Sequence, residues 1–218
     1  MSAREEILAR VRTALTDVPD RSPAEDAPVD WVYGQPVAID DVLGDFVEKV
    51  VDYKATVVQC SPAQVGEKIA EALRSNGVES AVVPHGLASQ WQEAIAGAGV
   101  QLHVDAPGAP LSAAELNQIG AVVTAATVGA AETGTIVLDH SADQGRRALT
   151  LVPDVHICVI RTDQLVSGVP EAVVRLKPAV QAGQPLTWIS GGSATSDIEL
   201  TRVEGVHGPR TLHVIVVG

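Results

Sequence analysis

Glu132 is the residue whose surroundings in the sequence most favour acid–base or nucleophilic chemistry. It is the one ionisable side chain of the short turn Ala130–Gly134, which lies between two apolar runs typical of buried strands. A carboxylate held on a tight turn is a candidate general acid, general base or covalent nucleophile. Thr133 and Gly134 of this turn and Thr135, which directly follows it, are candidate ligand-binding residues. The alternative interpretation is a charged hairpin tip in solvent.

A second turn, Ser190–Asp197, is rich in glycine and hydroxyl groups and follows another apolar run. Glycines let the backbone approach a ligand closely, and amide N–H groups beside hydroxyls are suited to holding a phosphate or a carboxylate. The turn lacks the lysine of a P-loop and does not match the dinucleotide fingerprint, so the anion is not specified. The alternative is a flexible turn that caps a short helix. The candidate anion-binding residues are Gly191, Gly192, Ser193, Thr195 and Ser196.

Arg146 and His207 complete the set of candidates. Arg146 belongs to the only paired basic site in the acidic central and C-terminal part of the chain, and arginine binds carboxylates and phosphates through two parallel hydrogen bonds. Its alternative role is a surface ion pair with Asp139 or Asp143. His207 lies on a glycine- and proline-containing turn before the last apolar run, where it is a candidate acid–base group or a structural residue.

The composition argues against several classes of function. The 218 residues include 27 acidic and 15 basic side chains, a net charge of −12, which disfavours nucleic-acid and anionic-membrane partners. No apolar stretch approaches the ~20 residues of a membrane span and the charged N-terminus is not a secretory signal, so we expect a cytoplasmic protein. We expect Cys60 and Cys158 to be small core residues. The six histidines lack metal-ligand spacing, so we expect no metal or cofactor on this chain.

Strand-like runs alternate with helical segments along most of the chain. This pattern and an aromatic content of 3% predict an α/β fold, with an open, largely parallel sheet flanked by helices. We expect this domain over residues 37–218, after an N-terminal helix (2–16) and a proline-containing arm that ends at residue 36. Ligands bind such sheets outside the strand carboxyl ends, where we place both candidate turns. The expected strands are 55–60, 80–83, 100–104, 120–129, 135–138, 155–161, 186–190 and 211–217. The expected helices of the domain are 41–53, 61–75, 87–96, 112–118, 170–176 and 197–202.

Four ordered motifs carry a resemblance to a known family. They are E-T-G-T-I-V-L (132–138), G-R-R-A-L-T-L-V-P-D-V-H-I-C-V (145–159), S-A-T-S-D-I-E (193–199) and G-V-H-G-P-R (205–210). Together they resemble the LUD-domain (YkgG-like) family of the lactate utilization protein C type, whose N-terminal helix also begins similarly to A-R-E-E-I-L here. The family's turn usually reads G-P-S-x-T-A-D-I-E. Gly192 stands here in place of the proline, which bears on the rigidity of the loop and not on its register.

The resemblance implies a fold and a pathway. The fold is that of glucosamine-6-phosphate deaminase, ribose-5-phosphate isomerase and CoA transferases (NagB/RpiA/CoA-transferase-like). The implied role is the oxidation of L-lactate to pyruvate with two partners, lactate utilization proteins A and B, which carry iron–sulfur clusters. CoA transferases of this fold group use a glutamate in a short E-x-G turn, and Glu132-Thr133-Gly134 is similar to it.

The leading hypothesis is a non-redox component of a lactate-oxidising assembly. It places a small carboxylate or a phosphate-bearing ligand between the turn 130–134, Arg146 and the turn 190–197, with Glu132 as the acid–base or nucleophilic group. The alternatives are a self-sufficient isomerase or acyl/CoA-transfer enzyme and a non-catalytic scaffold subunit. The hypothesis requires Glu132 and Ser193 to converge on one pocket.

Overall fold

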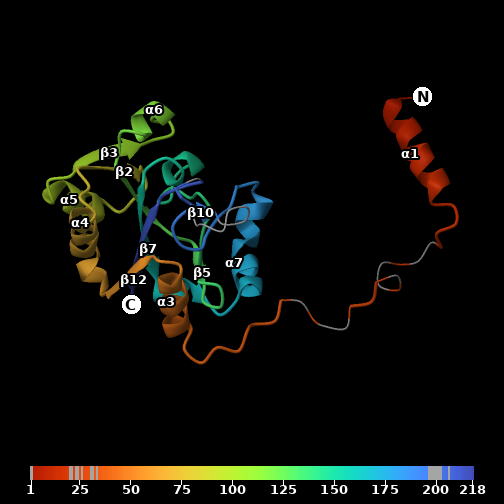
Figure 1. Cartoon of the computed structure of the whole chain (residues 1–218), viewed down its shortest axis with the longest axis horizontal. Helices are drawn as coiled ribbons and strands as arrows, with labels where there is room; N and C mark the ends of the chain where they lie inside the picture. Colours follow the sequence, from red (N-terminus) through yellow and green to blue (C-terminus); the bar gives the residue numbers. More distant parts are fainter. Residues whose placement is uncertain are drawn as a thin grey trace. The chain divides into compact units, whose positions relative to one another are not determined.

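The structure is a computed structural model that describes residues 2–19, 22, 25, 27–29, 32, 34–195, 203–205 and 207–218. Contacts divide the chain into two units, Met1–Tyr33 and Gly34–Gly218. The first contains α1 (Ala3–Ala14; Figure 1). A capping box pairs Ser2 with Glu5 at the start of this helix, and none of the helix residues is buried. The predicted N-terminal helix is confirmed. The predicted helix 197–202 and Ser196 lie outside the described residues.

The second unit is built on a six-stranded sheet, here called the large sheet. Every neighbouring pair of its strands is parallel, which confirms the predicted α/β class. In spatial order the strands are β1 (Thr56–Cys60), β12 (Thr211–Val217), β7 (Val155–Arg161), β4 (Ala121–Ala125), β2 (Ser80–Pro84) and β3 (Gln101–Asp105). Valine, isoleucine and alanine dominate these strands because a parallel sheet is covered on both faces.

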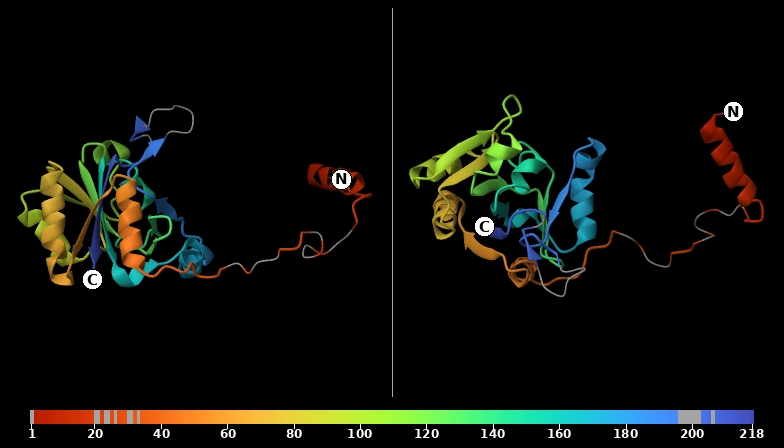
Figure 2. Two further views of the ribbon diagram at one scale, coloured as in Figure 1. Left: turned by 60° about the horizontal axis from the view of Figure 1, so that its bottom comes forward. Right: turned by 45° about the horizontal axis from the view of Figure 1, so that its top comes forward.

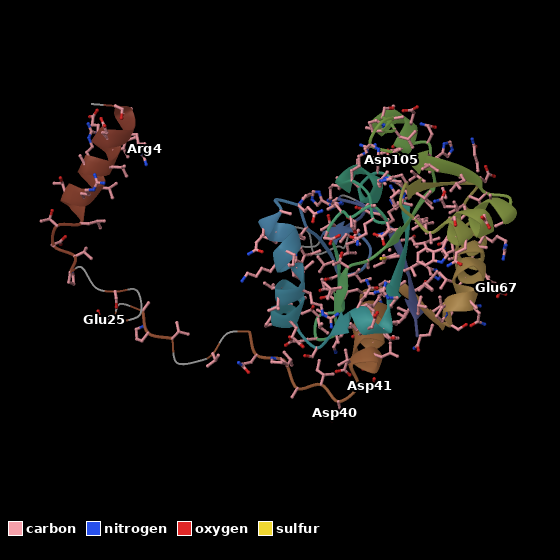
Figure 3. The ribbon with its side chains drawn as sticks, turned by 180° about the vertical axis from the view of Figure 1, so that it is seen from behind. Arg4, Glu25, Asp40, Asp41, Glu67 and Asp105 are labelled. Carbon is pink, nitrogen blue, oxygen red and sulfur yellow. The ribbon has the colours of Figure 1, made fainter. Side chains whose placement is uncertain are left out.

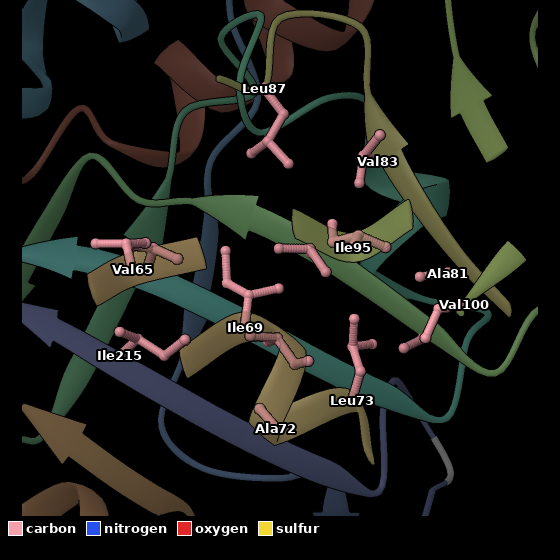
Figure 4. Close-up of a cluster of buried hydrophobic side chains, with 14 of the residues drawn as sticks. Val65, Ile69, Ala72, Leu73, Ala81, Val83, Leu87, Ile95, Val100 and Ile215 are labelled. Atoms are coloured by element: carbon pink, nitrogen blue, oxygen red, sulfur yellow. The ribbon is translucent and has the colours of Figure 1, made fainter. Parts of the chain in front are cut away.

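Two helices cover one face of the large sheet. A 3-10 turn (Pro62–Gln64) leads into α4 (Val65–Ser75), and α5 (Ser89–Gly97) packs beside it. Ile69 and Leu73 of α4 meet Ile95 of α5 in a fully buried cluster over the sheet (Figure 4). The short helix α6 (Ala113–Leu116) then leads into β4.

The other face of the large sheet packs against a second, four-stranded sheet, here called the small sheet. Its strands, in order, are β8 (Leu165–Val166), β5 (Val128–Ala130), β6 (Thr135–Leu138) and β9 (Thr187–Ile189). Helix α3 (Val42–Asp52) inserts Phe46 and Val50 into the cluster that both sheets share, on the side of the large sheet opposite α4 (Figure 2). Helix α7 (Val169–Gln181) covers the outer face of the small sheet. A short antiparallel pair, β10 (Ala194–Thr195) and β11 (Val203–Glu204), follows β9.

The apolar run 120–129 forms two strands instead of the one that its pattern predicts. β4 ends at Ala125 in the large sheet, and β5 begins at Val128 in the small sheet. Between them the Gln164 amide donates to the Ala126 carbonyl (2.6 Å), and the Gln144 amide donates to the Thr127 hydroxyl (2.8 Å). Both strands are buried on both faces, so hydrophobicity alone does not reveal the break.

The expected position of the two candidate turns at the carboxyl ends of parallel strands holds for one turn and is wrong for the other. Both preceding strands belong to the small sheet, where β5 is parallel to β8 and antiparallel to β6, and β9 pairs with β6, antiparallel. The turn after β9 therefore does not lie at the carboxyl edge of a parallel sheet.

Candidate functional site

A pocket of about 320 Å³ opens between the large sheet and the edge strand β9 of the small sheet, and we call it the Arg147 pocket. The backbone turns at 191–192 and 208–209 form part of its wall, together with Ile189 and Leu212. Among the described residues that line it there is no aspartate or glutamate. Its main polar side chains are Arg147, Thr150, His156, Ser190, Ser193 and His207.

Arg147 gives the pocket its positive charge. It begins a 3-10 turn (Arg147–Thr150), and its Nη1 donates to the carbonyl and the hydroxyl of Thr150, both at 3.1 Å. Within the described part of the chain, its Nε and Nη2 make no hydrogen bond. Burial lowers the pKa of the guanidinium, but arginine stays protonated in proteins. The remaining N–H groups are therefore available to a carboxylate or a phosphate.

His156 forms the floor of the pocket from β7. Its side chain is 1% exposed, and its Nε2 lies 2.8 Å from the Thr124 hydroxyl of the neighbouring strand β4. Burial, with a smaller contribution from the Arg147 charge, lowers the pKa of His156 to about 4. His156 is therefore neutral at pH 7 and does not compete with Arg147 for an anion.

We expect the His156 ring to titrate near pH 4 in an NMR experiment that follows the imidazole protons, with a His156→Gln variant to assign the resonance. Because the folded-state pKa lies below the unfolded value of ~6.5, the unfolded chain binds more protons as the pH falls through this window. Folding stability must therefore fall between about pH 6.5 and 4, and less so in His156→Gln. A His156 resonance that titrates above pH 6 would contradict the burial seen here.

The glycine turn is fixed by close backbone approaches. The Ser193 amide donates to the Pro209 carbonyl (2.7 Å), and the Ser193 hydroxyl accepts from the His207 amide (2.9 Å). Gly191 has φ +88°, and a Cβ there would lie 2.5 Å from the Cβ of Tyr53. A Cβ on Gly192 would collide with the Arg210 carbonyl. The structure thus brings Gly191, Gly192, Ser193 and His207 together, whereas the Thr195 side chain lies outside the described atoms.

The Glu132 turn reaches the pocket through hydroxyl groups. The Thr135 hydroxyl lies 2.8 Å from the hydroxyl of Ser190, which lines the pocket, and 2.8 Å from that of Thr133. Gly134 packs against α3, where a Cβ would lie 2.7 Å from the Cβ of Lys49. The Glu132 side chain is not among the described lining residues. Its Oε2 lies 3.2 Å from the position that a Cβ on Gly168 would take.

Arg146 lies outside the described lining of the Arg147 pocket and is paired with Asp105. Asp105 lies at the end of β3 (Figure 3). Its Nε donates to Oδ2 (2.9 Å) and its Nη2 to Oδ1 (2.8 Å) of Asp105, and Nη2 also donates to the Leu111 carbonyl. Asp105 is 6% exposed, so this is a largely buried carboxylate held by a two-point contact. The acid partner is Asp105, not the Asp139 or Asp143 that the sequence suggested.

We expect this pair to make folding stability sensitive to acid. Burial raises the pKa of Asp105, but hydrogen bonds from Arg146 and from the Leu111 amide outweigh it, and the net pKa is lower than usual. A depressed carboxyl pKa contributes stability above the unfolded value of ~3.9 and loses it as the pH falls through the folded value. Urea unfolding between pH 5 and 2.5 should show a smaller loss of stability in Asp105→Asn than in the wild type. Equal losses of stability in Asp105→Asn and the wild type would show that the Arg146–Asp105 pair does not make folding sensitive to acid.

The comparisons agree with this fold and place the chain in a family. The LUD domain model matches residues 43–217, and the chain therefore belongs to the LUD-domain family. It is 50% identical to lactate utilization protein C of Deinococcus radiodurans over 84% of this chain and 82% of that protein. It is also 35% identical to protein YkgG of Escherichia coli, over 49% of this chain and 47% of the relative. The crystal structure of a DUF162 family protein from Deinococcus radiodurans superposes with a TM-score of 0.69, at 44% identity, over 84% of this chain and all of that one.

The structure also describes the two cysteines and the residues that were considered for metal binding and membrane insertion. Both cysteines are free thiols, Cys158 buried and Cys60 partly exposed. Within the described ranges, no group of three or more His, Cys, Asp or Glu side chains is arranged to hold a metal ion. A membrane-spanning helix is likewise absent from the described residues.

Arg147, Thr150, His156 and Leu212 line the pocket but are not among the site residues predicted from the sequence. The doubled arginine was the one signal in the sequence that pointed near Arg147.

Proposed function

We propose that this chain is a non-redox component of a system that oxidises L-lactate to pyruvate, and that its Arg147 pocket binds a small carboxylate. The observation that carries the proposal is a partly buried guanidinium whose Nε and Nη2 make no hydrogen bond to the described residues, in a pocket whose described lining has no acidic residue. In a chain of net charge −12, such a pocket is a local exception that favours an anion. The similarity to lactate utilization protein C supports lactate or pyruvate as that anion.

The proposed roles of the residues follow from their positions. Arg147 binds the carboxylate, as Arg146 is already engaged by Asp105. The hydroxyls of Ser190 and Ser193 and the amides of the glycine turn hydrogen-bond the remaining oxygens. His207 borders the same space and is the candidate acid–base group.

Electron transfer is assigned in this proposal to partner proteins. Oxidation of a 2-hydroxy acid to a 2-oxo acid releases two electrons and two protons, and the proposed acceptors are the iron–sulfur clusters of lactate utilization proteins A and B. This chain would bind the acid and orient it. The support for partner proteins is the name of the relative, lactate utilization protein C, because the letter C implies a system with other proteins of this series.

Two measurements test the proposal. Titration calorimetry of the purified chain with L-lactate and pyruvate is expected to show binding. Deletion of the coding region is expected to abolish growth on lactate, and the wild type but not Arg147→Gln should restore it. Normal growth of the deletion strain on lactate would remove the pathway assignment, and absence of binding of either acid would remove the proposed ligand.

A second candidate is a self-sufficient isomerase or acyl-transfer enzyme, favoured by the hydroxyl contacts that join the E-T-G-T turn to the pocket. In that case Glu132 acts as the base or nucleophile. Turnover of sugar phosphates or CoA esters by the chain alone, lost in Glu132→Gln, would support it. Rescue of growth on lactate by Glu132→Gln would instead separate the pathway role from any catalysis by Glu132.

A further inference from the structure

The Arg147 pocket is larger than a three-carbon acid requires. If each non-hydrogen atom of lactate is given the ~30 Å³ that one molecule takes in liquid water, lactate occupies at most ~180 Å³. The pocket measures about 320 Å³. More than a third of the space therefore remains when lactate is bound.

The described lining of the pocket includes one charged side chain and several apolar ones. Arg147 and His156 both line the pocket, the first from the 3-10 turn and the second from β7. His156 pairs in register with Leu212 on the neighbouring strand β12, so their side chains lie next to one another on the same face of the large sheet. Leu212 belongs to the buried cluster against which Ile189 of β9 packs.

A ligand whose carboxylate binds Arg147 therefore shares the pocket with the neutral His156 and with Leu212 and Ile189. Leu212 and Ile189 are apolar and Ile189 is only partly buried, so this part of the lining offers hydrocarbon and no charge. Such a surface favours an apolar substituent over water.

Resting on the proposed function, we infer that the pocket selects 2-hydroxy or 2-oxo acids with a branched or otherwise larger apolar side chain than the methyl group of lactate, and that Ile189 determines this selectivity. The Arg147 contact is common to all such acids, whereas the contact with Ile189 is made only by the longer ones.

The test compares pyruvate with 4-methyl-2-oxopentanoate by titration calorimetry. An apolar pocket discriminates by about tenfold or more for each added carbon group that it buries. We therefore expect the branched acid to bind at least ~10-fold more tightly than pyruvate. In Ile189→Ala the ratio of the two affinities should fall to ~3-fold or less.

Ile39→Ala is the matched control, because Ile39 packs against the same cluster but does not line the pocket. The Ile39→Ala variant should keep the wild-type ratio of the affinities for the two acids. Equal affinity of the wild type for both acids, or an unchanged ratio in Ile189→Ala, would overturn the inference and leave the proposed function intact. If neither acid binds the wild type, the proposed function fails and the inference fails with it.

Discussion

Replacement of Arg147 by glutamine is expected to weaken the binding of pyruvate and lactate by ~10- to 100-fold, because a hydrogen bond to a charged group contributes ~1.5–3 kcal/mol. The variant should fold, since Arg147 lies in a surface 3-10 turn and its hydrogen bonds go only to Thr150 within the described chain. Arg147→Lys should recover part of the affinity, because lysine keeps the charge but not the planar fork. The measurement is calorimetry at low ionic strength.

Arg146→Gln is the control, since it removes a neighbouring arginine of the same charge. Asp105 would then be left buried without its partner, so this variant should lose stability and retain its affinity for the acid. Opposite results, with binding lost in Arg146→Gln and kept in Arg147→Gln, would show that the anion site lies at the Asp105 pair and not at the Arg147 pocket.

The second large effect is expected on stability. Phe46 is the only phenylalanine in the chain and is fully buried where α3 meets both sheets. Its ring lies against Gly129 of β5, where a Cβ would approach Cε2 to 3.0 Å. Phe46→Ala removes most of this side chain from the core and should lower the free energy of unfolding by ~3–5 kcal/mol. Urea unfolding measured by circular dichroism gives this value.

Phe46→Leu should cost much less than Phe46→Ala, because leucine refills most of the cavity. Val173→Ala on α7 provides a baseline, since that valine is 52% exposed and should change stability by no more than ~0.5 kcal/mol. A loss below ~1 kcal/mol in Phe46→Ala would mean that α3 does not hold the two sheets together.

The two arginines show where sequence reasoning fails. Arg146 and Arg147 are adjacent and chemically identical, and either satisfies the pattern of a cationic loop residue. Arg146 reaches Asp105 at the end of β3, whereas Arg147 lines the pocket beside β7. Asp105 lies 41 positions before Arg146. The local sequence therefore does not show that Asp105 pairs with Arg146 and not with Arg147.

The local sequence determined most of the strands and helices, the α/β class and the family. Apolar runs, capping residues and the four ordered motifs are properties of neighbouring residues, and they predicted β7 and β12 at their observed bounds. The local sequence also identified the turn at 190–193 and the turn that contains His207 as candidate sites, and residues of both turns line the Arg147 pocket.

Only the tertiary structure decided which strands belong to which sheet. It also decided that Arg147 is the cation of the pocket and that His156 forms its floor. A strand buried on both faces has the same composition in either sheet, so only its pairing partners separate β4 from β5. His156 and Leu212 become neighbours because β7 and β12 pair in parallel, although 56 positions separate them in the chain. Contacts of this kind depend on how distant elements pack, which local residue patterns do not specify.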